Sequence, residues 1–421
     1  MSNQKNSYLV PMIIIGLLFS IFGYTTWING ILIPYLKITC ELQYDWQSYL
    51  VATAFFIAYP VMAIPSSELL KRTGYKKGMA VGLIVMVIGY LIFIGAAKIR
   101  DYSIFLTGLF IIASGLAVLQ TAANPYVSKI GPIESAASRI SLMGLCNKLA
   151  GILASLIFGY IALSDTDALV ASLKTMDTAT RATTLDALAE RVVLPNIIYA
   201  AFLLVIAFVI YKSTLPELKE EEPDTEGGTA TPSTKTSIFQ FPHLLIGALA
   251  LFLYVGAEVI AGDTIISYGK SLGIEMSKAK LFTTATLTSM VVGYVVGIFL
   301  IPRVLSQQTA LKISAILGIG FSTLGVVTTG AVSVFFIVML GLANALMWPA
   351  IFPLAVSDLG KFTKTGSAFL IMGIGGGALM PPLYGLLAES IGSQYAYVML
   401  VPCYAIILYF AIKGYRAGKA A

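Results

Sequence analysis

Two charged side chains, Lys148 and Glu258, lie deep inside long apolar stretches of the sequence. A charge at the centre of a bilayer costs about 2.5 to 3.5 kcal/mol on insertion scales, so it is kept where it has a partner or a function. Three roles fit: an ion pair between the two, a Na⁺ site that uses the Glu258 oxygens, and an acceptor for ligand hydroxyls. Asp263 and Thr264 would add oxygen ligands for a cation. The sequence leaves these three roles open.

Side-chain amides and indoles form a second group inside the apolar stretches. An amide offers both donors and acceptors and so matches a ring of hydroxyls, while an indole stacks against an apolar C–H face. Gln120 and Asn124 are four residues apart and therefore share one helix face, where both can line a cavity. The alternative is that these amides only join helices by hydrogen bonds. The group consists of Trp27, Asn29, Gln120, Asn124, Asn147, Asn344 and Trp348.

The elements that position these residues must be membrane helices. The chain has 421 residues, of which 57% are hydrophobic and 11% charged, and this is too apolar for a soluble core. A bilayer core about 30 Å thick needs roughly 20 apolar residues per helix. Twelve stretches of that kind predict an all-α membrane protein. They are residues 11–36, 46–70, 78–97, 103–128, 138–163, 193–212, 241–267, 280–301, 309–330, 332–356, 366–389 and 394–412.

Two hydrophilic segments divide the chain. Residues 165–192 carry leucines at helical spacing and predict short amphipathic helices outside the membrane, as a passive cap in preference to a lid. Residues 213–239 have the composition of a flexible cytoplasmic linker. The predicted organisation is a six-helix bundle over 1–212, the linker, and a second six-helix bundle over 240–421. A weak repeat supports it, since a shift of 229 residues superposes spans 4 and 5 on spans 10 and 11.

Basic residues predict the orientation. With both termini in the cytoplasm, 17 Lys and Arg residues lie on the inner side and 9 on the outer side, and Lys148 completes the 27. The net charge of +6 therefore reports topology, and no nucleic-acid partner is expected. The protein is expected to be surrounded by lipid and to be a monomer.

No enzyme motif is found in the sequence. There is no phosphate-binding loop ending in Gly-Lys-Ser/Thr, no zinc-protease helix motif and no nucleophile elbow. The three cysteines have no ligand-like spacing, so neither a disulfide framework nor a metal site is expected. Two similar halves without an ATP site predict a secondary transporter with no cofactor, apart from a coupling ion.

The chain resembles the major facilitator superfamily. Its loop between spans 2 and 3, from Ser67 to Lys77, keeps the Arg-x-Gly and basic residues of the signature of that superfamily but lacks the leading Gly and the Asp. Within the superfamily it is similar to the fucose permease family, and there to the bacterial glucose/galactose permeases. The matching stretches are Leu119 to Pro125, Gly131 with Pro132, Met143 to Gly151, Phe252 to Glu258, Trp348 to Phe352 and Gly366 to Pro382.

This resemblance implies import of a monosaccharide by cation symport across the bacterial inner membrane. It favours Gln120, Asn147 and Trp348 as sugar contacts, because they match family positions that face the cavity or are aromatic. For Asn344 helix packing is favoured. Asn124 and Trp27 fit either sugar contact or helix packing. For Asn124 the packing role arises because an amide before Pro125 can bond freed backbone groups. Asn29 stays a candidate sugar contact.

The resemblance also bears on the coupling ion. Similar fucose permeases carry acidic residues at the positions of Gly30 and Gln120, and neither residue here can titrate. Na⁺ is therefore expected, with Glu258, Asp263 and Lys148 as the coupling residues and Glu258 also a candidate sugar contact. The alternatives are a proton symporter of fucose or N-acetylglucosamine, a proton-antiport exporter, and a sugar sensor that does not transport.

Overall fold

The computed structural model describes residues 2–129, 136–213, 236–301 and 304–418. Over these residues the chain is helical and contains no strand, and twelve helical segments are long and apolar enough to cross a bilayer. The predicted fold class, an all-α membrane protein with twelve spans, is confirmed. Most of the predicted linker, all but its two ends, lies outside the described residues. Gly131 and Pro132 also lie outside them. The domain boundaries stay a prediction.

The first half of the chain builds spans 1 to 6. Spans 1 and 2 are each divided into shorter helices. Between spans 5 and 6, where short helices are predicted over 165–192, the structure has two. The helices are α1 (Ser2–Trp27), α2 (Asn29–Thr39), α3 (Asp45–Ser48), α4 (Leu50–Phe56), α5 (Ala58–Thr73), α6 (Tyr75–Ile99), α7 (Tyr102–Lys129), α8 (Ala136–Leu163), α9 (Thr166–Leu173), α10 (Thr178–Glu190) and α11 (Val193–Lys212).

The second half builds spans 7 to 12 with more interruptions. Its helices are η2 (Ile238–Gln240), α12 (Pro242–Asp263), α13 (Ile265–Ser271), α14 (Met276–Ala279), α15 (Phe282–Leu300), α16 (Gln307–Val327), α17 (Gly330–Asn344), α18 (Met347–Val356), η3 (Gly360–Phe362), α19 (Thr363–Met372), η4 (Gly373–Gly375), α20 (Gly376–Ile391), α21 (Ser393–Ala396), η5 (Tyr397–Met399), α22 (Leu400–Ile412) and η6 (Gly414–Arg416).

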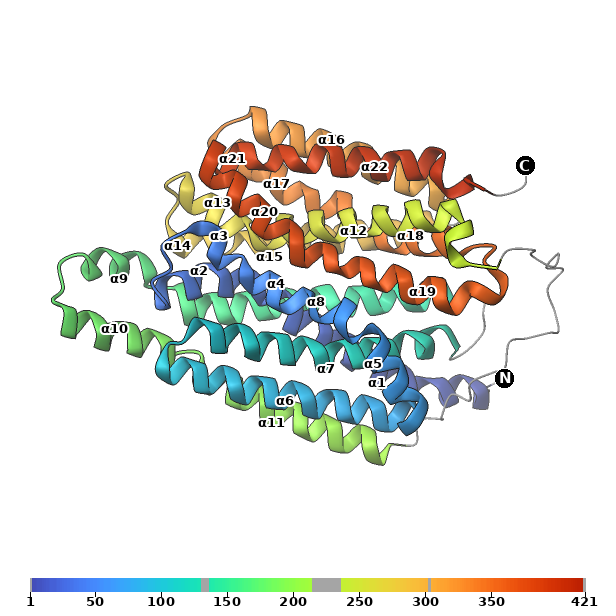
Figure 1. Cartoon of the computed structure of the whole chain (residues 1–421), viewed down its shortest axis with the longest axis horizontal. Coiled ribbons are helices and arrows are strands. Elements are labelled where there is room, and N and C mark those ends of the chain that lie inside the picture. Colours follow the sequence, from blue (N-terminus) through green and yellow to red (C-terminus); the bar gives the residue numbers. More distant parts are fainter. Residues whose placement is uncertain (1, 130–135, 214–235, 302–303, 419–421) are drawn as a thin grey trace.

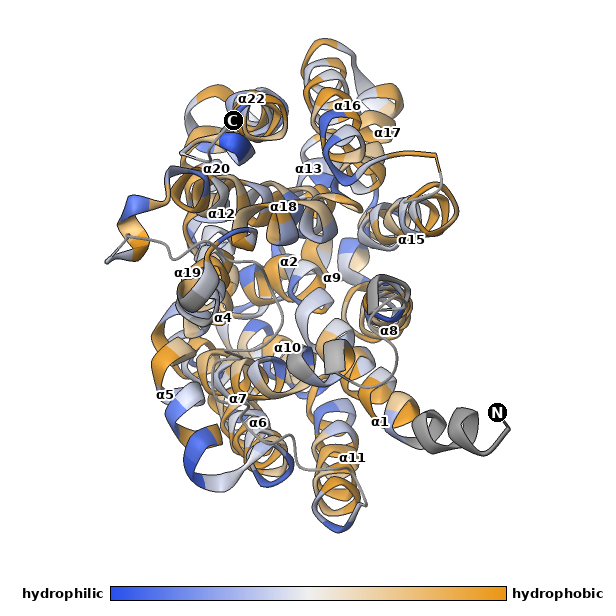
Figure 2. Ribbon diagram, turned by 90° about the vertical axis from the view of Figure 1, so that its right-hand side faces the viewer, coloured by the Kyte–Doolittle hydropathy of each residue, from blue (hydrophilic) through white to orange (hydrophobic). Residues whose placement is uncertain are grey.

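The two halves lie side by side, with α8 against α15, α4 against α20 and α5 against α19 (Figures 1 and 2). Both ends of the chain lie at one end of the helices, and α9 and α10 lie at the other (Figure 1). Large apolar side chains face outwards, and Phe208 and Phe299 are each 64% exposed. A surface this apolar fits lipid rather than water.

Several spans break at the depth of the polar residues. Span 1 breaks between α1 and α2 at Ile28, and span 7 breaks between α12 and α13 at Thr264. Span 11 narrows to the 3-10 turn η4 in its glycine-rich stretch. Non-helical backbone inside a membrane is tolerated where protein or a cavity satisfies it, and in transporters such breaks occur near binding sites.

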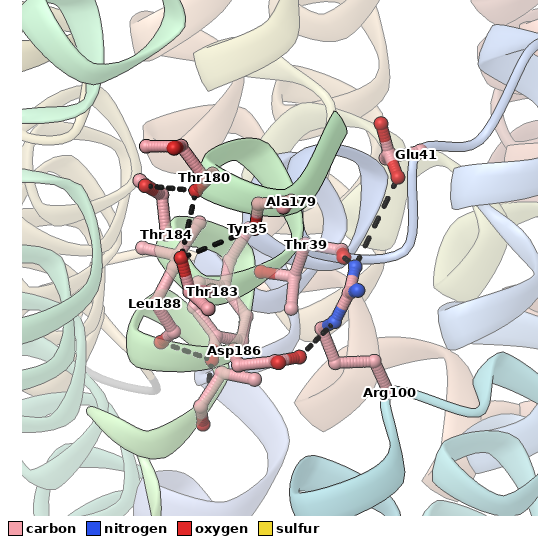
Figure 3. Close-up of polar contacts among 11 residues, drawn as sticks. Tyr35, Thr39, Glu41, Arg100, Ala179, Thr180, Thr183, Thr184, Asp186 and Leu188 are labelled. Atoms are coloured by element: carbon pink, nitrogen blue, oxygen red, sulfur yellow. Dashed lines mark hydrogen bonds and ion pairs between the residues drawn. The ribbon is translucent and has the colours of Figure 1, made fainter. Parts of the chain in front are cut away.

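The α9–α10 segment is attached to the first half by polar contacts (Figure 3). Arg100 donates to Asp186 of α10 (2.5 Å) and to the Thr39 carbonyl at the end of α2 (3.3 Å). The Tyr35 hydroxyl, also on α2, donates to the Leu188 carbonyl (3.0 Å). These contacts hold α10 over the ends of spans 1 and 3, as a cap would lie.

Close helix packing of α6 on α7 depends on two glycines. A Cβ added at Gly115 would lie 2.3 Å from the Gly82 carbonyl oxygen and 2.8 Å from the Met86 nitrogen. Both neighbours are backbone atoms and cannot move aside without shifting α6. Small residues allow this kind of backbone approach in membrane bundles.

We expect Gly115→Ala to destabilise the protein by about 1 to 3 kcal/mol, the usual cost of overpacking. Gly95→Ala on α6 is the matched control, because a Cβ there meets no atom within 4 Å. The measurement is the thermal unfolding midpoint of both variants in the same detergent. An unchanged midpoint for Gly115→Ala would contradict the close packing of α6 on α7.

Candidate functional site

A small, largely enclosed pocket lies between the two halves. Its walls come from α5 and α7 of the first half and from α18, α19 and η4 of the second. Two amides and one indole face it among apolar and small side chains. The lining residues are Tyr59, Ala63, Ala117, Gln120, Thr121, Asn124, Trp348, Ile371 and Ile374.

Three of the predicted ligand residues meet in this pocket. Gln120 and Asn124 stand in the α7 wall, and Trp348 faces them from α18. The Gln120 amide nitrogen donates to the Tyr59 hydroxyl (3.2 Å), which fixes the direction of the amide. Trp348 stacks on Phe352 at 5.9 Å between ring centroids with 20° between planes, so its ring is held in one orientation. The pocket thus combines fixed hydrogen-bonding groups with a flat aromatic surface.

A second polar group, which we call the ion-pair cluster, consists of Trp27, Asn147, Lys148 and Glu258. The Lys148 ammonium lies 3.0 Å from Glu258 Oε1, and the two side chains are only 7% and 12% exposed. The same ammonium lies 4.1 Å from the centre of the Trp27 ring, and Trp27 Nε1 donates to Asn147 Oδ1 (3.3 Å). Of the three roles that the sequence leaves open, the structure shows the ion pair.

This ion pair joins the two halves, since Lys148 is on α8 and Glu258 is on α12. Removing two charges from water is costly, and good geometry with extra contacts offsets that cost. Here the Trp27 ring adds a cation–π contact to the ammonium. Trp27 is 3% exposed and does not line the pocket, so its position fits packing and support of Lys148.

Two other candidates lie apart from the pocket. Asn344 is fully buried, and its Oδ1 accepts a hydrogen bond from the Tyr404 hydroxyl (3.0 Å), which joins α17 to α22 within the second half. This arrangement corresponds to helix packing. Asn29 is also fully buried, and neither polar atom of its amide has a hydrogen-bond partner among the described residues.

The remaining candidates lie where span 7 breaks. The Asp263 carboxylate is 1% exposed, and no hydrogen bond to its Oδ1 is found in the described part of the chain. Thr264 bonds the Ile260 carbonyl (2.7 Å) and the Tyr397 hydroxyl (2.8 Å) through its own hydroxyl, so that oxygen is already engaged. Gly30 on α2 lies directly against Asp263.

Two contributors were missed at the level of sequence. Tyr59 lines the pocket and orients Gln120, but a tyrosine before Pro60 in an apolar span gives no signal of its own. Thr283 bonds the Gly262 carbonyl (2.7 Å) next to Asp263. The cluster of threonines between positions 283 and 288 in span 8 is a signal that could have pointed to it.

We expect Lys148→Met to lower the free energy of unfolding by about 3 to 5 kcal/mol, because it leaves the buried Glu258 carboxylate unpaired. Glu258→Gln leaves the ammonium unpaired and should act similarly. The double variant Lys148→Met/Glu258→Gln should lose less than either single variant, since neither member of the pair is left without its partner. Thermal unfolding of the four proteins in detergent provides the double-mutant cycle. Strictly additive losses would show that the pair is not coupled.

Comparison with known proteins agrees with this architecture. The family model of the Major Facilitator Superfamily matches residues 13–375. The chain is 35% identical to a glucose/galactose transporter of Brucella abortus over 99% of this chain and 96% of the relative. It is 29% identical to the L-fucose-proton symporter of Escherichia coli, over 97% and 94% of the two chains.

A solved structure shows the same arrangement of helices. The crystal structure of the transporter FucP in the outward conformation superposes with a TM-score of 0.75 at 28% identity, covering 99% of this chain and 100% of that one. The relatives are transporters and not enzymes, and the predicted resemblance is confirmed. The chain belongs to the major facilitator superfamily.

Proposed function

We propose that this protein imports a hexose of the glucose or galactose type by symport with Na⁺, through alternating access of a site between its two halves. The observation that carries the proposal is the pocket lined by Gln120, Asn124 and Trp348. A sugar ring offers hydroxyls to the amides and a C–H face to the indole. The name of the relative that is 35% identical over nearly the whole chain supports the same substrate class.

The choice of Na⁺ rests on the charged groups. Gly30 and Gln120 occupy the positions at which similar fucose permeases carry acidic residues. The proton route of those permeases therefore lacks its carboxylates in this chain. Glu258 and Asp263 are the carboxylates of span 7 that approach the interface between the halves. The rival is a proton symporter of fucose, which the name of the Escherichia coli relative favours. Ion dependence separates the two.

Alternating access is supported by contacts across the halves at the α9 end. Asp167 on α9 pairs with Lys270 and accepts a hydrogen bond from the Met276 nitrogen (2.6 Å), both in the second half. At the same end the Trp46 nitrogen donates to Glu389 (3.1 Å). We propose that this end faces the outside of a bacterial cell and that both termini lie in the cytoplasm. In the state described, the two halves contact each other at this outer end. The transporter would then act in the inner membrane as a monomer.

The test is uptake by proteoliposomes that contain the purified protein. Radiolabelled glucose, galactose, fucose and N-acetylglucosamine are each offered with an inward Na⁺ gradient at equal pH, and with an inward proton gradient without Na⁺. We expect uphill accumulation of a hexose with the Na⁺ gradient. Accumulation of fucose with the proton gradient alone would favour the rival. Absence of counterflow for every sugar would indicate a sensor or a transporter of other cargo.

We expect Gln120→Leu to raise the KM for the transported hexose by roughly 5- to 150-fold. The reason is that a buried hydroxyl left without its partner costs about 1 to 3 kcal/mol. Thr107→Val on the same helix is the matched control, because the Thr107 side chain is exposed and bonds only its own helix, at the Ser103 carbonyl (2.9 Å). Initial uptake rates over a range of sugar concentrations give the KM of each variant. An unchanged KM would remove Gln120 from the sugar site.

A further inference from the structure

The Asp263 carboxylate is buried and lacks the compensation that Glu258 has. Glu258 is paired with Lys148 at 3.0 Å, whereas Asp263 is 1% exposed and its Oδ1 has no hydrogen-bond partner among the described residues. Among the described residues, Glu258 and Lys148 are the charged side chains that interact electrostatically with Asp263. One positive and two negative groups leave one negative charge uncompensated. A carboxyl group in this position is neutralised either by a proton or by a bound cation.

Other oxygen atoms gather around this carboxylate. A Cβ built on Gly30 would lie 3.2 Å from Asp263 Oδ1, 3.2 Å from the Gly262 carbonyl oxygen and 3.0 Å from Thr283 Oγ1. The Thr283 hydroxyl gives its proton to the Gly262 carbonyl (2.7 Å) and is not available as a donor to Asp263. Three oxygen atoms, from Asp263, Gly262 and Thr283, therefore surround one point beside Gly30 with no free donor among them. Such a set suits a hard cation and does not suit an anion.

Helix geometry strengthens the negative character of this place. Helix α12 ends at Asp263 and α13 begins only at Ile265, so the last carbonyls of α12 point toward the break. The C-terminal end of a helix carries a partial negative charge, and interrupted membrane helices use such ends to hold cations. Helix α2 starts at Asn29, whose buried amide has both polar atoms unpartnered in the described residues. Four buried oxygen or amide groups thus lie at or beside one junction of α2, α12 and α15.

We propose that Asp263 binds the monovalent cation that drives transport, with the Gly262 carbonyl and the Thr283 hydroxyl as additional oxygen ligands. The Glu258–Lys148 pair then joins the halves and does not carry the ion. This inference rests on the proposed symport function and names the site of its coupling ion. Because Gly30 belongs to the first half and Asp263 to the second, a bound cation tightens the contact between α2 and α12. Cation binding and closure of the two halves are thereby linked.

The first experiment compares wild-type protein with Asp263→Asn in proteoliposomes. We expect Asp263→Asn to equilibrate sugar and to support counterflow, but to lose accumulation beyond equal concentrations inside and outside. Glu275→Gln, which alters an exposed carboxylate in the loop before α14, is the matched control and should accumulate sugar as wild type does. Varying Na⁺ at fixed pH, and pH without Na⁺, shows whether the bound cation is Na⁺ or a proton.

A carboxylate exchange provides the strongest positive result. The Cβ position of Gly30 lies 3.2 Å from the Asp263 oxygen, so Gly30→Asp combined with Asp263→Gly moves the carboxylate to the opposite helix within the same oxygen cluster. We expect this double variant to recover cation-driven accumulation that Asp263→Gly alone lacks.

A binding measurement covers the case in which Asp263→Asn does not reach the membrane. The Trp27 ring packs on Gly262, with its Cζ3 2.6 Å from a Cβ built there. In Trp46→Phe/Trp348→Phe protein, Trp27 is the single tryptophan left of three. Its fluorescence should change saturably with the coupling cation, and Thr283→Val should shift the midpoint to higher cation concentration. Wild-type accumulation by Asp263→Asn, or a flat titration with both cations, would overturn the assignment. Wild-type protein that accumulates no sugar under either gradient would instead refute the proposed symport.

Discussion

The contact between Lys148 and Glu258 is the interaction on which the centre of this structure depends. Neither group can be solvated by lipid, and each is stable at this depth because the other lies 3.0 Å away. The pair connects α8 of the first half to α12 of the second. Trp27 and Asn147 extend it on the α8 side through a cation–π contact and a hydrogen bond. A rearrangement of the two halves has to keep this pair or exchange it for other partners.

The polar groups around the ion pair form two separate sites, one suited to a sugar and one suited to a cation. The pocket of Gln120, Asn124 and Trp348 offers fixed hydrogen bonds and an aromatic surface, and none of the described side chains that line it is charged. The Asp263 junction offers a carboxylate and other oxygen atoms. Each place involves both halves of the chain. A substrate at one and an ion at the other would therefore act on the same interface, which is the physical requirement for coupling their movements.

Helix breaks and glycines make these places possible. The interruptions at Ile28 and Thr264 release backbone carbonyls beside Gly30 and Asp263, where continuous helices would have used them internally. At Gly30 the absent side chain leaves room for three oxygen atoms of the second half. Close approach elsewhere, as at Gly115, holds the helices of one half together so that it can move as a unit.

The sequence alone was sufficient for the twelve spans and the fold class, because lipid excludes unpaired polar groups and leaves an unmistakable apolar pattern. It also singled out Lys148 and Glu258, since charges in such stretches are rare. It could not choose among their three roles, because a pair between spans 5 and 7 depends on how the two halves meet. For the same reason Tyr59 and Thr283 escaped notice, and the hydrogen bond between Tyr404 and Asn344 could not be foreseen. Hydropathy is a local property that the chain carries in its order, whereas the partner of a buried polar atom is decided by packing between helices that lie far apart in that order.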